Sequence, residues 1–208
     1  MVDIKQEVKM AFTENRTAIV ASVLILFISL ILGYVFEPYL QSYLHPVVDD
    51  LTNKVQTGVI KLTFMDIFTN NIMIVLRMFI FGIFFCFSAL ILSFNGFFVG
   101  YYVAIQDNFL RVFLYLVPHG IFEFSSCILA CASGFVLFHF VFRFIKSFIF
   151  KTGLGFVERF EQSFDDNFDK LKQAFILLLI ASVLMMAAGV IEAYITLPLA
   201  EYLLSVLG

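Results

Sequence analysis

The sequence predicts an all-α integral membrane protein, a bundle of about five transmembrane helices with one discontinuous helix and two interfacial amphipathic helices. First, 62% of the 208 residues are hydrophobic and only 14% are charged, whereas soluble chains have roughly 45–50% and about 25%. Second, apolar runs long enough to cross a hydrocarbon core of ~30 Å recur along the chain. Because a soluble fold could not bury this much apolar surface, we expect residues 1–208 to form a single integral membrane domain.

The first two spans are expected at residues 18–36 and 72–92. The run 18–36 follows a polar N-terminal segment and is longer than the apolar core of a cleavable signal, which has roughly 7–15 residues. We therefore interpret it as a retained anchor.

Residues 93–117 are expected to form one crossing that is broken near its middle by Asp107-Asn108. The alternative is a re-entrant hairpin with this pair at its tip, which fits the distribution of charge less well. The fourth and fifth spans are expected at 119–142 and 174–197, and Pro118 suits the first turn of the fourth because its missing N–H would be unpaired there anyway.

Two polar segments have the periodicity of amphipathic helices. After Pro46, apolar residues recur at steps of three or four, which predicts an outer amphipathic segment at 46–66. In a cytoplasmic segment at 153–172, phenylalanines recur at every fourth position among acidic residues. This second pattern favours packing against the end of the bundle, and the alternative is a docking surface for a partner.

The orientation follows from the distribution of basic residues. The N-terminal segment is basic, and the loop between the fourth and fifth spans carries Arg143, Lys146, Lys151, Arg159, Lys170 and Lys172. Segment 37–70 carries only two lysines. The positive-inside rule therefore predicts a multi-pass protein of the cell membrane with a cytoplasmic N-terminus.

Ionisable residues within the expected spans are the main candidates for a functional site, because each costs ~2.5–3.5 kcal/mol at the centre of a membrane helix. The expected spans place four of them about 7–9 Å below the outer surface, on four helices: Arg77, Arg111, Glu123 and Glu192. His119 is one turn from Glu123 on the same face, and Asp107 is deeper. We predict that the arginines pair with the glutamates in a buried polar layer, which either fixes helix register or binds an ion, proton or solute.

Small residues recur at every fourth position in two spans, which predicts close helix packing. These helix-packing candidates are Gly96, Gly100, Ala104, Ser126, Ala130 and Gly134. Such faces pack either within one chain or between two copies, and a homodimer is the more specific of these two interpretations.

Several function classes are disfavoured. No phosphate loop, nucleophile elbow or zinc-binding histidine pair is present, so we expect neither enzymatic activity nor a cofactor or metal. The net charge of −3 without a basic stripe argues against nucleic-acid binding. The three cysteines lie within apolar runs, where they are expected to be packing residues.

Several motifs resemble the stage II sporulation protein M family over nearly the whole chain. The most specific are the Pro-His-Gly motif at 118–120 with Glu123, and the Ile-Glu-Ala-Tyr motif at 191–194 with Pro198. The likeness also includes Thr69-Asn70-Asn71, Gly82, and Asn95-Gly96 with Gly100.

The resemblance implies a multi-pass membrane protein without enzymatic activity, with recurring polar positions at His119, Glu123 and Glu192. In endospore formers the namesake scaffolds cell-wall-degrading partners during engulfment, and relatives occur in bacteria and archaea that never sporulate. We therefore expect a membrane scaffold that self-associates, with membrane lipids and other membrane or envelope proteins as partners. The alternatives are a small channel or transporter that uses the polar layer, and a lipid-handling or membrane-remodelling protein.

Overall fold

The computed structural model describes residues 4–58 and 63–207, and every regular element in these ranges is helical. The α-helices are α1 (Ile4–Glu14), α2 (Arg16–Val35), α3 (Glu37–Gln56), α4 (Phe64–Phe81), α5 (Cys86–Ala104), α6 (Phe109–Phe150), α7 (Phe156–Asp165), α8 (Phe168–Ile191) and α9 (Leu197–Leu207). A 3₁₀ turn, η1 (Gly82–Phe84), follows α4, and a π-helical turn, η2 (Glu192–Thr196), follows α8.

Five helical segments in the described part of the chain are long and apolar enough to cross a membrane. They are Arg16–Val35, Phe64–Phe84, Cys86–Ala104, Phe109–Phe150 and Phe168–Val206. The prediction of an all-α membrane protein with about five spans is therefore confirmed.

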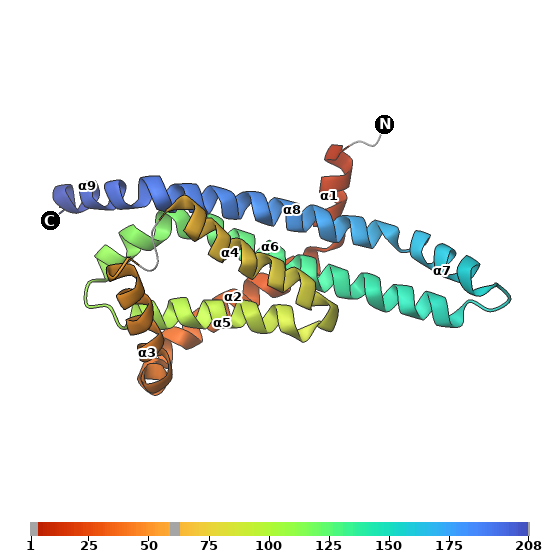
Figure 1. Ribbon diagram of the computed structural model, residues 1–208, viewed down its shortest axis with the longest axis horizontal. Helices are drawn as coiled ribbons and strands as arrows, with labels where there is room; N and C mark the ends of the chain where they lie inside the picture. The colour runs from red at the N-terminus through yellow and green to blue at the C-terminus, as the bar shows by residue number, and fades with distance from the viewer. Residues whose placement is uncertain (1–3, 59–62, 208) are drawn as a thin grey trace.

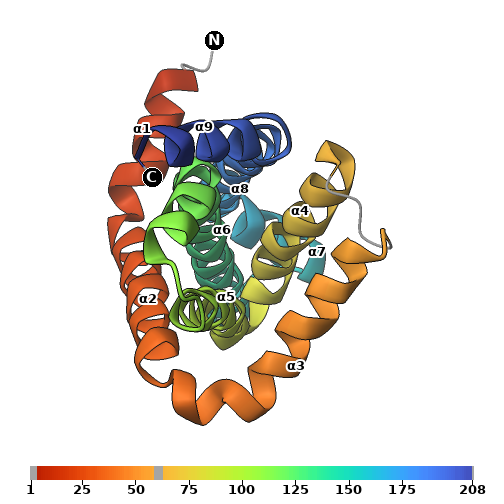
Figure 2. The ribbon, with the colours of Figure 1, turned by 90° about the vertical axis from the view of Figure 1, so that its left-hand side faces the viewer.

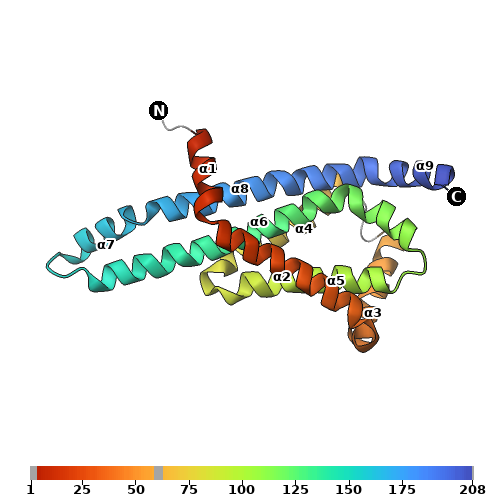
Figure 3. The ribbon, with the colours of Figure 1, turned by 180° about the vertical axis from the view of Figure 1, so that it is seen from behind.

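The longest helices, α6 and α8, lie side by side along the long axis, and α2 packs mainly on α5 (Figure 1). The loop 105–108, α3 and α9 lie together at one end, which we call the pocket end. Helices α1 and α7 lie toward the other, which we call the hairpin end because α6 and α8 extend there past the α4–α5 turn (Figure 3).

The expected boundaries of the second and third spans need correction. Helix α4 begins at Phe64, where the Thr63 hydroxyl accepts a hydrogen bond from the Asp66 amide. The turn between α4 and α5 consequently falls at 82–85 and interrupts the expected span 72–92. The expected crossing 93–117 is also divided, because α5 ends at Ala104 and α6 starts after the loop.

Two local features account for this difference. The Asn108 side chain caps α6 by accepting a hydrogen bond from the Arg111 amide at 2.9 Å, so Asp107-Asn108 forms a loop between two long helices. Pro118 lies inside α6 instead of at a helix start, and α6 changes direction within its first half (Figure 3). That bend is expected where proline removes a backbone donor.

The two amphipathic segments also differ from their expected bounds. The outer segment predicted at 46–66 is replaced by α3, which starts at Glu37 and ends at Gln56, and residues 59–62 lie outside the described residues. Helix α3 crosses the pocket end from α2 toward α4 (Figure 2). It contacts α5 through His45, whose Nδ1 lies 3.3 Å from the Tyr101 hydroxyl.

Helix α7, within the predicted segment 153–172, packs on the last turns of α6. Phe160 meets Phe144 edge to face with ring centroids 5.2 Å apart, and Phe156 meets Phe148 at 5.4 Å. This contact is the packing arrangement that the sequence pattern favoured.

The small-residue faces pack within the chain. Gly96 and Gly100 lie against the backbone of α2, where a Cβ at Gly96 would come within 2.8 Å of the Leu26 carbonyl oxygen. Gly134 lies against Gly82, and the Ser126 hydroxyl donates a hydrogen bond to the Ala181 carbonyl of α8 at 2.6 Å. Of the remaining two, Ala130 is fully buried and Ala104 is partly buried.

Candidate functional site

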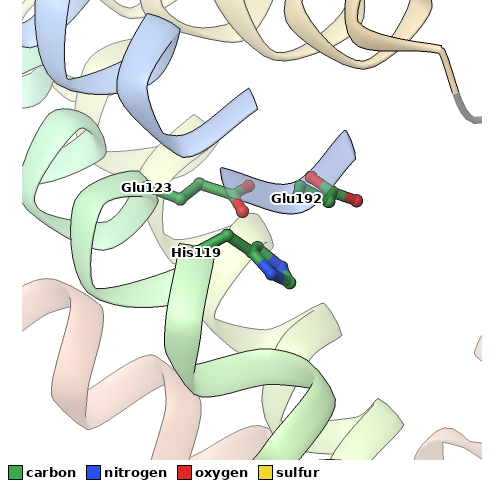
Figure 4. Close-up of side chains that lie close together, drawn as sticks. All are labelled: His119, Glu123 and Glu192. Atoms are coloured by element: carbon green, nitrogen blue, oxygen red, sulfur yellow. The ribbon is translucent and has the colours of Figure 1, made fainter. Parts of the chain in front are cut away.

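Three ionisable side chains meet where α6 passes the junction of α8 and α9. His119 and Glu123 lie one turn apart on the same face of α6, and Glu192 is the first residue of η2. One imidazole nitrogen and one carboxylate oxygen from each glutamate all lie within 4.8 Å of one another. Figure 4 shows the three side chains converging from the two elements. We call them the His-Glu-Glu cluster.

The π-helical turn aligns the last span with this cluster. Pro198 has no N–H to donate to the carbonyl four residues earlier, and its ring crowds that carbonyl, so the preceding turn widens. In the widened turn the Thr196 hydroxyl donates a hydrogen bond to the Ile191 carbonyl five residues earlier, at 3.1 Å. Single π-helical turns of this kind are frequent at functional sites.

Thr196 also contacts the imidazole ring of His119. Nδ1 of His119 lies 3.2 Å from the Thr196 hydroxyl oxygen. That hydroxyl has one proton, which the Ile191 carbonyl already accepts. With its proton on the Ile191 carbonyl, the Thr196 hydroxyl oxygen can accept from a protonated Nδ1, an arrangement that would leave the imidazole lone pair on Nε2.

A cavity of about 710 Å³ at the pocket end reaches this cluster. Its wall includes His119 and Glu192 and is made by the end of α5, the loop 105–108, the start of α6, η2 and the start of α9. The lining residues are Tyr102, Gln106, Asp107, Asn108, Arg111, Val112, Tyr115, Leu116, His119, Glu192, Ala193, Thr196 and Leu197.

The structure brings together some of the residues of the predicted polar layer and separates others. His119, Glu123 and Glu192 are adjacent, and Arg111 and Asp107 line the same cavity. Arg77 is exposed on α4, four residues before that helix ends at the turn between α4 and α5. Because α4 starts eight residues earlier than the expected span, Arg77 lies in the second half of α4 and not near its start.

The predicted pairing of arginines with glutamates is absent from the described residues. No ion pair there joins Arg77 or Arg111 to Glu123 or Glu192. The Arg111 guanidinium instead lies over the Tyr115 ring, 5.8 Å from its centroid. The two carboxylates of the cluster therefore face each other without an arginine partner.

Thr196 is a site residue that sequence reasoning did not single out. Its hydroxyl matters only because the helix widens at η2, and the available signal was Pro198 two residues later. A second polar network, at the hairpin end, was also missed. There the Asn15 amide donates to the Gln173 side-chain oxygen at 2.8 Å, and the Gln173 amide donates to Glu14 at 2.9 Å.

This combination of five apolar helices and a polar cavity at one end defines a multi-pass α-helical membrane protein. The chain belongs to the stage II sporulation protein M family, whose model matches residues 22–197. It is 31% identical over 180 residues to an uncharacterized protein of the archaeon Methanocaldococcus jannaschii, an alignment that covers 84% of this chain and 93% of that protein. No solved structure matches the chain.

Proposed function

We propose that the protein is a non-enzymatic scaffold of the cell membrane that self-associates and organises partner proteins through its hairpin end. The observation that supports this proposal is the length of α6, whose 42 residues extend about 63 Å at 1.5 Å per residue. A membrane core of about 30 Å accommodates roughly half of that length. Part of the excess length, the last 12 residues of α6 from His139, forms together with the chain through α7 to Lys172 what we call the projecting hairpin.

The projecting hairpin has exposed apolar side chains at its tip. Phe150 is 74% exposed, Phe156 is 73% exposed and Val157 is 66% exposed. Apolar side chains clustered outside the membrane core are typical of a protein–protein contact. The basic residues on this part of α6 favour a cytoplasmic position for the projecting hairpin under the positive-inside rule.

Charge complementarity favours a second copy of the chain as the first partner. Helix α7 presents acidic residues, among them Glu158 and Glu161. The last turns of α6 line a groove of about 560 Å³ that includes Arg143 and Lys146. Lys151 also lines it and is already paired with Asp166 at 2.7 Å. Two hairpins side by side can therefore set the acidic helix of one copy against the basic groove of the other.

The oligomeric state tests this proposal. We expect wild-type protein in nanodiscs to have the mass of a dimer by light scattering, and the double substitution Phe150→Glu, Phe156→Glu to give monomers. Tyr39→Glu is the matched control, because Tyr39 is 77% exposed and lies on α3 at the pocket end. A monomeric wild type, or equal dissociation by the control, contradicts the proposal.

Transport is the second candidate function, and the cavity that reaches His119 and Glu192 favours it. Beyond the His-Glu-Glu cluster, however, α6 is tightly packed, since Ala130, Cys131 and Ala132 are fully buried. An ion-flux assay in liposomes separates the two functions. A flux that Glu192→Gln abolishes supports transport, and the absence of flux supports the scaffold.

A further inference from the structure

We propose that His119, Glu123 and Glu192 bind a divalent transition-metal ion, with Zn²⁺ as the representative, at the inner end of the cavity. Their ligand atoms lie within 4.8 Å of one another. Ligands bound at ~2.0–2.2 Å to a tetrahedral zinc lie roughly 3.4 Å apart. Side-chain movements of about 1 Å therefore bring the three groups into coordination, and such movements are within the freedom of two glutamate side chains.

The contact between His119 and Thr196 is a second observation that supports a bound cation. Nδ1 lies 3.2 Å from the Thr196 hydroxyl oxygen, so the ring can direct Nδ1–H to Thr196 and offer the Nε2 lone pair to an ion. A metal-binding histidine characteristically uses its second ring N–H to contact an outer group, which fixes the tautomer and the orientation of the ring. Thr196 occupies the position of that outer group.

The electrostatics of the cluster also favour binding of a positive charge. Neither Glu123 nor Glu192 has a hydrogen-bond or ion-pair partner in the described ranges 4–58 and 63–207. Two carboxylates and an imidazole lone pair in contact repel one another, and the surrounding membrane helices provide little dielectric screening. A divalent cation among them converts this repulsion into attraction.

The types of ligand select the class of metal. An imidazole nitrogen favours transition metals such as zinc, whereas magnesium and calcium prefer sites made of oxygen alone. Three protein ligands leave a fourth position of a tetrahedral ion open. His119 and Glu192 line the cavity together with Arg111, so a water molecule or an anionic oxygen group in the cavity could take that position.

Titration of tag-free, metal-stripped protein with ZnCl₂ in detergent tests this site. We expect one Zn²⁺ per chain by calorimetry and by elemental analysis, with no comparable binding of Mg²⁺. Glu123→Gln and Glu192→Gln should each weaken the affinity at least tenfold. Glu201→Gln makes the same chemical change at an exposed position of α9 and should leave the affinity unchanged.

X-ray absorption on the zinc-loaded wild type keeps the proposal falsifiable if a variant does not fold. It should show a first shell of nitrogen and oxygen atoms without sulfur, although three cysteines are present. The proposal is overturned if the wild type binds no Zn²⁺, if the glutamine variants bind it as tightly as the wild type, or if sulfur ligands appear.

Discussion

At the scale of single residues, the close contact between α6 and the end of α4 depends on two glycines. Gly134 of α6 faces Gly82, and the Met78 carbonyl oxygen would be 2.7 Å from a Cβ at position 134. The Ser88 hydroxyl donates a hydrogen bond to that same carbonyl. Membrane helices have no hydrophobic driving force toward one another, so backbone contacts of this kind provide a large part of their packing energy.

Gly134→Ala should therefore destabilise the protein. The added methyl group meets backbone atoms that cannot rotate away, and overpacking of this kind costs about 1–3 kcal/mol. Thermal unfolding in detergent should show a lower midpoint than that of the wild type.

Gly120→Ala provides the matched control on the same helix. A Cβ at position 120 would lie 3.7 Å from Phe124 and 3.8 Å from Leu116, which are ordinary contact distances. The control should unfold no earlier than the wild type, because alanine favours helix. An equal decrease of the unfolding midpoint in both variants would contradict the assigned contact.

At the scale of elements, the turn between α4 and α5 is apolar throughout. Ile83, Phe84 and Phe85 are all more than 40% exposed. Phe85 has a positive φ of 38°, and its ring packs on Phe135 and Phe138 at 5.2 Å and 5.1 Å. With Ser88 bonded to a carbonyl of the last turns of α4, this turn has the internal hydrogen bonding that lipid requires.

We predict that this turn lies in the lipid of one leaflet and not in water. Cys86 is exposed at its end, whereas Cys127 and Cys131 are buried. In liposomes Cys86 should resist water-soluble maleimides added to either face, and it should react once the protein is denatured.

Gly155→Cys in a Cys86→Ser background is the positive control for accessibility. Position 155 lies in the exposed loop of the projecting hairpin, and a Cβ there meets no atom within 4 Å. Labelling of Cys86 at a rate comparable to that of this control would place the turn in water.

The expected and observed elements differ mainly in their boundaries, for physical reasons that single residues illustrate. Hydropathy locates apolar runs, but within a membrane it does not distinguish a turn from a helix, so the apolar turn at 82–85 was missed. Asn95-Gly96 has the composition of a turn, yet Gly96 lies within α5 and allows close packing against α2. Only the tertiary contact distinguishes these two uses of glycine.

At the scale of the whole molecule, the sequence predicted the class, the number of apolar helices and the convergence of His119, Glu123 and Glu192. It did not predict their neighbours. Arg77 was expected beside the glutamates because hydropathy predicts a later start for its helix than Phe64. The helix widening that positions Thr196 depends on backbone geometry that periodicity does not record.

The hairpin-end network joins the first helix of the chain to the last span. Lys170 donates to Glu14 at 2.8 Å, and Gln173 is 1% exposed. Hydrogen bonds from Lys170 and Gln173 lower the pKa of Glu14 below its usual value of 4.5. This carboxylate therefore stabilises the folded state above pH 4.5, and the stabilisation is lost as the pH falls through the lowered pKa.

We predict that acidification destabilises the wild type more than Glu14→Gln. At pH 7 the variant should unfold at a lower temperature than the wild type, because the glutamine lacks the charge that Lys170 contacts. The difference should shrink as the pH falls below 4.5, since Glu14 then becomes neutral in both states. Glu201→Gln, at an exposed position of α9, should follow the wild type, and a constant difference between Glu14→Gln and the wild type at all pH values would refute the assignment.

The continuity of α6 has a mechanical consequence. Gly134, at its tightest contact, is 15 residues from His119 and 16 from Phe150, or about 23 Å from each at 1.5 Å per residue. The contact at Gly134 therefore lies midway between the cavity wall and the tip of the projecting hairpin. A tilt of about 10° would displace the cavity wall and the hairpin tip by about 4 Å in opposite directions, given this spacing. A ligand that tilted α6 in this way from one end would thus move the other end, without breaking a backbone hydrogen bond of the helix.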